Sequence, residues 1–125
     1  MAVARRRIGI EEGRAALAAW RESAGSPSDV PVPRSVTATA VRYTLEEVTA
    51  RAPGNSVEVR VPPFGVTQCV EGPRHTRGTP PNVIECDAAT WLGMATGQLS
   101  WADAVAAGRV AASGLRADLS ALLPL

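Results

Sequence analysis

The chain has 125 residues, which is enough for one buried core without disulfide or metal support and too short for several domains. Its 13 basic and 12 acidic residues give a formal net charge of +1, so no general attraction to nucleic acid or to an anionic membrane is expected. Hydrophobic residues make up 46% and aromatic residues 4%, which predicts a core built largely from Ala, Val and Leu.

The first residues are basic and contain Arg5, Arg6 and Arg7. Three arginines without interleaved aromatic residues favour a flexible, solvated arm over residues 1–8 rather than a nucleic-acid or headgroup site. Glu11 and Glu12 interrupt the apolar run that a signal peptide needs, and no stretch approaches the length of a membrane span. We therefore expect a cytoplasmic protein with a single domain over residues 9–125, no stable membrane insertion and no nucleic-acid partner.

Two amphipathic helices are predicted next, because apolar residues recur at helical spacing on one face of each segment. The first ends at Gly25, and the second covers residues 35–52 and stops at Pro53. Prolines make the intervening residues 26–33 an extended linker. The apolar positions of the two helices are Ile10, Gly13, Leu17, Trp20 and Ala24, then Val41, Leu45, Val48 and Ala52.

The pattern then changes to the twofold period of strands. Val57–Val61 alternates strictly, and residues 65–71 and 83–86 read as two further strands. Gln68 in the second of these has a polar side chain among apolar ones, so it is expected near a sheet edge or facing a polar group. Residues 72–82 are rich in Gly, Pro and Arg and predict a long, exposed, irregular loop.

The last third of the chain is the most informative part. Asp87 is placed to cap a helix over Ala88–Thr96 that ends at Gly97, and Ser100 is placed to cap a second helix over residues 101–107. Residues 109–113, between two glycines, predict a strand. From residue 115 onward leucines at helical spacing predict a final helix.

This order resembles the C-terminal half of sterol-carrier-protein-type-2-like domains, in their small stand-alone bacterial form. The resemblance lies in the joint spacing of three glycines and the apolar positions between them, over about the last third of the chain. The residues that carry it are Thr90, Trp91, Leu92, Ala95, Gly97, Leu99, Ser100, Ala104, Val105, Gly108, Arg109, Val110, Ser113, Gly114, Asp118, Leu119 and Leu122. It implies an α+β fold with a mostly antiparallel four- or five-stranded sheet, covered on one face by helices, and an apolar cavity that binds lipid.

Apolar residues of the C-terminal third are the candidate wall of such a cavity. The alternative is a packed core in which tryptophan fills the space that alanine-rich helices leave, and the sequence does not distinguish a lined cavity from a filled one. No cofactor is indicated. The candidate ligand-binding residues are Trp91, Leu92, Met94, Ala95, Leu99, Trp101, Val105, Leu119 and Leu122.

The loop before residue 82 brings Arg74, His75 and Arg77 together, which suggests a polar cavity mouth or an anion contact. The simpler alternative is a solvated turn whose arginines pair with Glu71 or Glu85. A small lyase or isomerase would need His75 as a base, but no nucleophile or orienting acid stands at a recognisable spacing.

Cys69 and Cys86 form no disulfide framework and no zinc-binding pattern. One alternative is that they face each other on neighbouring strands and respond to oxidation. We expect both thiols to be free, buried and unreactive.

These observations predict a non-catalytic intracellular binding or carrier domain for an apolar or amphipathic, lipid-like ligand. The ligand's tail is expected between the sheet and the C-terminal helices. The alternative is a solid-core interaction or accessory module of an enzyme system, with a protein partner and no small-molecule ligand. Lipid extracted from the purified protein in near-stoichiometric amount would separate the two.

Overall fold

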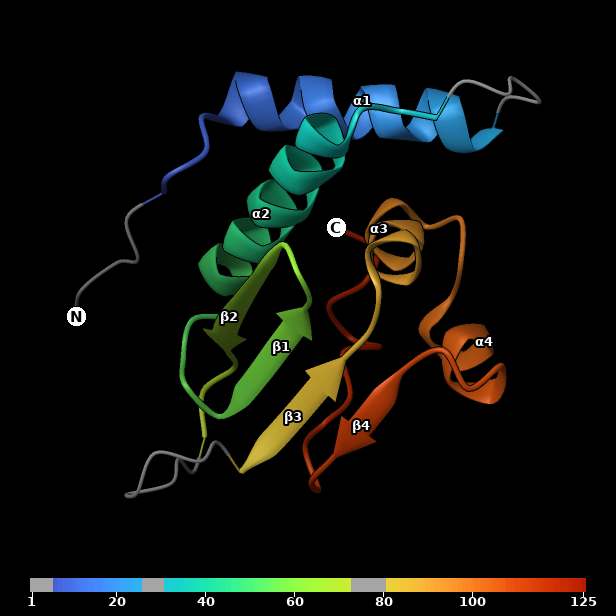
Figure 1. Cartoon of the computed structure of the whole chain (residues 1–125). Helices are drawn as coiled ribbons and strands as arrows, with labels where there is room; N and C mark the ends of the chain where they lie inside the picture. Colours follow the sequence, from blue (N-terminus) through green and yellow to red (C-terminus); the bar gives the residue numbers. More distant parts are fainter. Residues whose placement is uncertain (1–5, 26–30, 73–80) are drawn as a thin grey trace.

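The computed structural model describes residues 6–25, 31–72 and 81–125. Over these ranges the protein is an α+β domain with four helices and a four-stranded sheet (Figure 1). The elements in chain order are α1 (Ile10–Gly25), α2 (Arg34–Arg51), β1 (Val57–Val61), β2 (Gly65–Cys69), β3 (Asn82–Glu85), α3 (Ala88–Thr96), α4 (Trp101–Ala106) and β4 (Ala111–Ser113).

The strands lie in the order β2-β1-β3-β4. The outer pairs β1/β2 and β3/β4 are antiparallel, whereas the central pair β1/β3 is parallel. The register places Val59 beside Thr67 on one side and beside Ile84 on the other. The sheet is therefore mixed and mostly antiparallel, which confirms the expected fold class.

One face of the sheet carries the core. In β1 the side chains of Val57, Val59 and Val61 are wholly buried, while Arg60 between them is exposed. On this inner face the Oγ1 atoms of Thr67 in β2 and Thr49 in α2 are hydrogen-bonded, so α2 packs against it. The alternation of buried and exposed residues thus directs one face of β1 toward the helices and leaves the other face open.

Both N-terminal helices form where the apolar periodicity predicts them, and they cross each other (Figure 1). At the crossing, a Cβ atom on Gly13 would lie 2.2 Å from Cγ of Tyr43, so only glycine admits this approach of the Tyr43 ring to α1. The predicted bounds of α2 differ by one residue at each end from those in the structure.

Three strands are shorter or shifted relative to the sequence-based ranges. β2 ends at Cys69 instead of residue 71, because Val70 takes a positive φ of 66° and its N–H donates to the carbonyl of Ala52 at 2.6 Å. β3 begins one residue early, at Asn82, which is buried and so does not belong to the exposed loop predicted for residues 72–82. β4 begins at Ala111 instead of residue 109.

Gln68 meets both expectations made for it. β2 is an edge strand, and the side-chain amide of Gln68 donates to Oε1 of Glu58 at 3.5 Å. The two cysteines, in contrast, are not on neighbouring strands: Cys69 ends β2, Cys86 follows β3, and β1 lies between those strands. The structure excludes that alternative, because the chain crosses over from β2 to pair β3 with β1.

The caps of the two short helices are confirmed. Oδ1 of Asp87 accepts the N–H of Thr90 at 2.8 Å, and Gly97 ends α3 in the left-handed conformation at φ 82°. Oγ of Ser100 accepts the N–H of Asp103 at 3.0 Å, which opens α4. These side-chain oxygens satisfy backbone donors that have no partner in the first turn of a helix.

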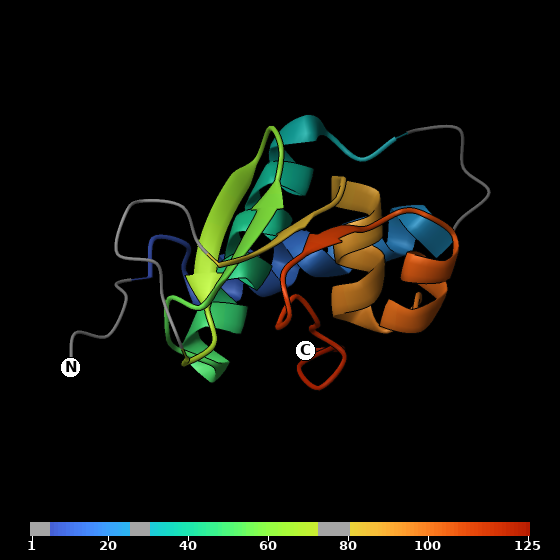
Figure 2. The ribbon, with the colours of Figure 1, turned by 90° about the horizontal axis from the view of Figure 1, so that it is seen from below.

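The predicted final helix is wrong, since residues 114–125 form only turns and irregular backbone (Figure 2, red). Oδ1 of Asp118 accepts a hydrogen bond from the N–H of Ser120 at 2.8 Å. Such a local side-chain hydrogen bond competes with the hydrogen bonds of a helical turn. Pro124 follows so soon that the segment is too short to offset the cost of helix nucleation. The leucines are nevertheless used, because Leu119 is wholly buried.

Candidate functional site

Helix α3 supplies the centre of the candidate apolar wall. All six residues from 90 to 95 are buried, as expected for a helix that is covered on nearly all sides. Trp91 and Leu92 are 0% exposed, and Met94 and Ala95 are 1% and 2% exposed. Trp91, Leu92 and Met94 belong to the same buried cluster as the inner residues of β1 and β3.

Trp91 joins α3 to α2. Its indole Nε1 donates a hydrogen bond of 2.8 Å to Oγ1 of Thr44, which is itself buried. Sequence reasoning missed Thr44, because the sequence does not show from which distant donor a threonine inside a helix will accept a hydrogen bond. The only available signal was that a buried tryptophan needs a partner for its N–H.

The turn after α3 brings two more candidates into contact with the core. Leu99 and Trp101 are half-buried against the buried cluster. The N–H of Leu99 donates to the carbonyl of Gly93 at 3.0 Å, which folds the turn back onto α3. Val105 does not join them: it lies on the outer side of α4 and is 44% exposed.

The C-terminal segment, residues 114–125, completes the cluster. Leu119 is wholly buried, and Leu122 is half-buried against the same core. Leu123 and Leu125, which were not among the candidate residues, also pack there. The N–H of Leu125 donates to the carbonyl of Ala95 at 2.9 Å, so the end of this segment lies against the end of α3.

Arg74, His75 and Arg77, the expected polar mouth, lie outside the described residues. At the start of β3 the structure shows a buried polar contact that the sequence did not reveal. The side chain of Asn82 donates to the carbonyl of Ser56 at 2.8 Å and accepts the N–H of Arg116 at 2.8 Å. Asn82 therefore ties the C-terminal segment to the sheet.

A separate open hollow of about 420 Å³ lies on the outer face of the sheet. None of the nine candidate ligand-binding residues contributes to it. Its charged residues are engaged at least in part with each other, since Nε of Arg60 pairs with Oε2 of Glu58. The residues that line it are Glu58, Arg60, Pro62, Pro63, Gly65, Val66 and Glu85.

The two thiols lie in the core and are free. Burial raises the pKa of Cys69 to about 11. Burial, together with the negative charges of Asp87 and Glu85, raises the pKa of Cys86 to about 12. Both thiols are therefore protonated at neutral pH and poorly nucleophilic.

Polar chemistry near α3 is limited to structural contacts. The buried hydroxyl of Thr90 accepts from Nε of Arg109 at 3.0 Å. Hydrogen bonds from Thr90, followed by the charge of Arg109, hold the pKa of Asp87 below its ordinary value. Within residues 6–25, 31–72 and 81–125, no three His, Cys, Asp or Glu side chains gather as metal ligands.

The helices that the structure describes are all too short or too polar to cross a bilayer.

An α+β domain whose buried α3 and C-terminal leucines pack on a mixed four-stranded sheet is the architecture that the sequence resemblance implied. A family model described as "Bacterial SCP ortholog" matches residues 33–125, which is well over half of the chain. The protein belongs to this sterol-carrier-protein-like family. Helix α1 lies before the matched region. A search of curated proteins found no match.

Proposed function

We propose that this protein is a non-catalytic carrier for an apolar or amphipathic, lipid-like ligand. Membership of the sterol-carrier-protein-like family supports a lipid-binding role in general terms. The ligand's tail lies between the sheet and the segment from α3 to the C-terminus, against the candidate wall built around Trp91, Leu92 and Leu119.

The observation that carries this proposal is the irregular C-terminal segment. It covers α3 with leucines, yet its backbone is held by isolated turns and by single contacts such as Leu125 to Ala95. A segment without a helix or strand can change position at a lower free-energy cost than a regular element. An alkyl chain would offer α3 the same kind of apolar contact that these leucines provide.

The polar end of the ligand is proposed to lie near the loop that contains Arg74, His75 and Arg77. Arginine side chains suit a carboxylate or phosphate, because the guanidinium group donates two parallel hydrogen bonds. No reaction is assigned to these residues, and the protein is proposed to act in the cytoplasm.

A second function, a solid interaction or accessory module, is favoured by one specific observation. Trp91, Leu92 and Leu119 are all 0% exposed, so their contacts are already filled in this structure. In that case a protein partner, rather than a lipid, would be bound.

Extraction of the purified protein with organic solvent, followed by mass spectrometry, tests the proposal. We expect close to one lipid-like molecule per chain, or saturable binding of one added fatty acid. Absence of co-purified lipid together with absence of fatty-acid binding would contradict the carrier function and favour the solid module.

A further inference from the structure

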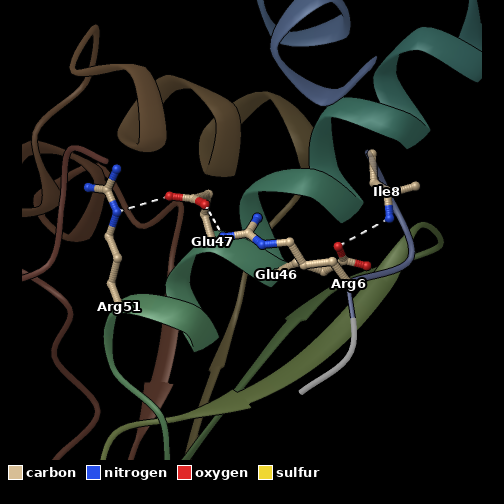
Figure 3. A network of polar contacts seen from close by, with 5 residues as sticks. All are labelled: Arg6, Ile8, Glu46, Glu47 and Arg51. Carbon is tan, nitrogen blue, oxygen red and sulfur yellow. Dashed lines mark hydrogen bonds and ion pairs between the residues drawn. The ribbon is translucent and has the colours of Figure 1, made fainter. Parts of the chain in front are cut away.

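Residues 6–8 precede α1 and are called the strap. Figure 3 shows that Arg6 in the strap forms an ion pair with the carboxylate of Glu47 in α2. The same carboxylate accepts from Nε of Arg51 at 3.0 Å. Burial alone would raise the pKa of Glu47, but hydrogen bonds and charges from Arg6 and Arg51 outweigh it and hold the pKa below its usual value.

The neighbouring carboxylate, Glu46, holds the backbone of the strap. Oε1 of Glu46 accepts the N–H of Arg7 at 2.9 Å. Oε2 accepts the N–H of Ile8 at 3.2 Å (Figure 3). One side chain of α2 thereby binds two successive backbone donors. The strap is fastened to α2 by adjacent glutamates that bind one side chain and two main-chain groups.

Helix α1 buries little apolar surface. Among its described residues only Gly13 and Ala16 are buried, and Leu17 and Trp20 are half-buried against the core. Helix α2, in contrast, buries six residues. Elements with little buried apolar surface open at a lower free energy than the core does.

Because of its position, movement of α1 away from the domain would expose other helices. It crosses α2 and reaches over α3 in Figure 1, and the matched family region begins only after it. The seam between α2 and α3 is joined by the hydrogen bond between Thr44 and Trp91, and Figure 1 shows α1 above both of these helices. Removal of α1 would also uncover the ring of Tyr43, which is 6% exposed when packed on Gly13.

We propose that α1 is a cover that opens as a unit while the remainder of the domain stays folded, and that the strap is its fastening. Opening uncovers the seam between α2 and α3 and admits an apolar ligand to the interior. The gating part of this inference rests on the proposed carrier function. The opening itself does not.

Amide hydrogen exchange of the full chain, followed by NMR, tests the opening. In the parent protein we expect α1 amides to exchange much faster than those of β1 and β3. The double variant Arg6→Ala/Glu46→Ala removes the ion pair and the acceptor of the strap, so α1 exchange should rise roughly 10-fold, with β1 and β3 unchanged.

Arg51→Ala is the matched control, because it removes the other cation from Glu47 and leaves the strap's own groups in place. It should alter α1 exchange by less than about twofold. If α1 amides exchange only together with those of β1 and β3, or if the double variant leaves α1 exchange unchanged, the proposal that α1 opens separately is overturned.

The gating part is measured by release of a bound fluorescent fatty acid after mixing with excess oleic acid. Release should be roughly 10-fold faster from the double variant than from the parent, in step with α1 exchange. Faster α1 exchange with unchanged release would overturn the gating. If the parent binds no fatty acid, the proposed carrier function fails, and hydrogen exchange still decides whether α1 opens.

Discussion

The indole of Trp91 and the hydroxyl of Thr44 form a 2.8 Å hydrogen bond inside the core, and both residues are buried. The hydroxyl also donates to the carbonyl of Ala40 at 2.8 Å, so it serves as donor and acceptor at once. This bond joins α3 to α2 and fixes Trp91, the largest fully buried side chain of the described residues.

Thr44→Val should destabilise the protein by about 1–3 kcal/mol, because it leaves the buried N–H of Trp91 without an acceptor. Thr44→Ser keeps the hydroxyl and should cost less. Urea denaturation of the two variants and the parent measures the difference in the free energy of unfolding. Equal stability of the valine variant and the parent would show that the hydrogen bond contributes nothing.

Gly114→Ala should cost about 2 kcal/mol or more, for two reasons. Gly114 has a φ of 110°, and an added Cβ would lie 2.4 Å from Oδ1 of Asn82, which holds Arg116 in place. Gly108→Ala is the control: φ is 72° and nothing lies within 4 Å of the added Cβ, so only the backbone cost of about 1 kcal/mol applies. If thermal unfolding finds both variants equally destabilised, the contact of the added Cβ with Asn82 contributes no extra loss of stability.

Asp87→Ala should destabilise the protein by about 1 kcal/mol through the loss of the α3 cap, and Asp87→Asn should retain most of the cap. The pKa of Asp87 is lowered in the folded state, so its carboxylate stabilises the fold above its unfolded pKa of about 4. That contribution is lost as the pH falls through the folded pKa. The stability difference between the parent and Asp87→Asn should therefore shrink from about pH 5 to about pH 2. A difference that stays constant on acidification would argue against an ionised cap.

Local signals in the sequence accounted for the helices and for most strands. The caps at Asp87 and Ser100 and the stop at Gly97 depend on neighbouring residues alone, so they could be read directly. The parallel pairing of β1 with β3 could not, because strand order depends on contacts between distant segments. Val70 ends β2 through a bond to the carbonyl of Ala52, which is equally non-local.

The burial of the candidate site residues was predicted in part. Seven of its nine apolar residues (Trp91, Leu92, Met94, Leu99, Trp101, Leu119 and Leu122) lie in or against one buried cluster. The periodicity of the leucines correctly marked Leu119 as buried and Leu122 as packed against the core, but it wrongly implied a helix, since a side chain can be buried from an irregular backbone as well. Whether these residues bind a ligand stays a prediction.

The division into an arm over residues 1–8 and a domain over residues 9–125 also stays a prediction. The contacts of Arg6, Arg7 and Ile8 with Glu46 and Glu47 could not be foreseen, because they join groups about 40 residues apart, as the separations of 41, 39 and 38 positions show.

The most direct test of the carrier function is titration of a fluorescent fatty acid into the parent and Leu119→Ala. Leu119 is 0% exposed, so its truncation should cost about 2–5 kcal/mol of stability, and added fatty acid should restore part of that loss by occupying the vacated space. Leu115→Ala, at a fully exposed leucine of the same segment, is the control and should change neither stability nor binding. We predict saturable binding of one fatty acid by the parent and tighter binding by Leu119→Ala. No binding by either protein, with the full stability loss in Leu119→Ala, would contradict the carrier function.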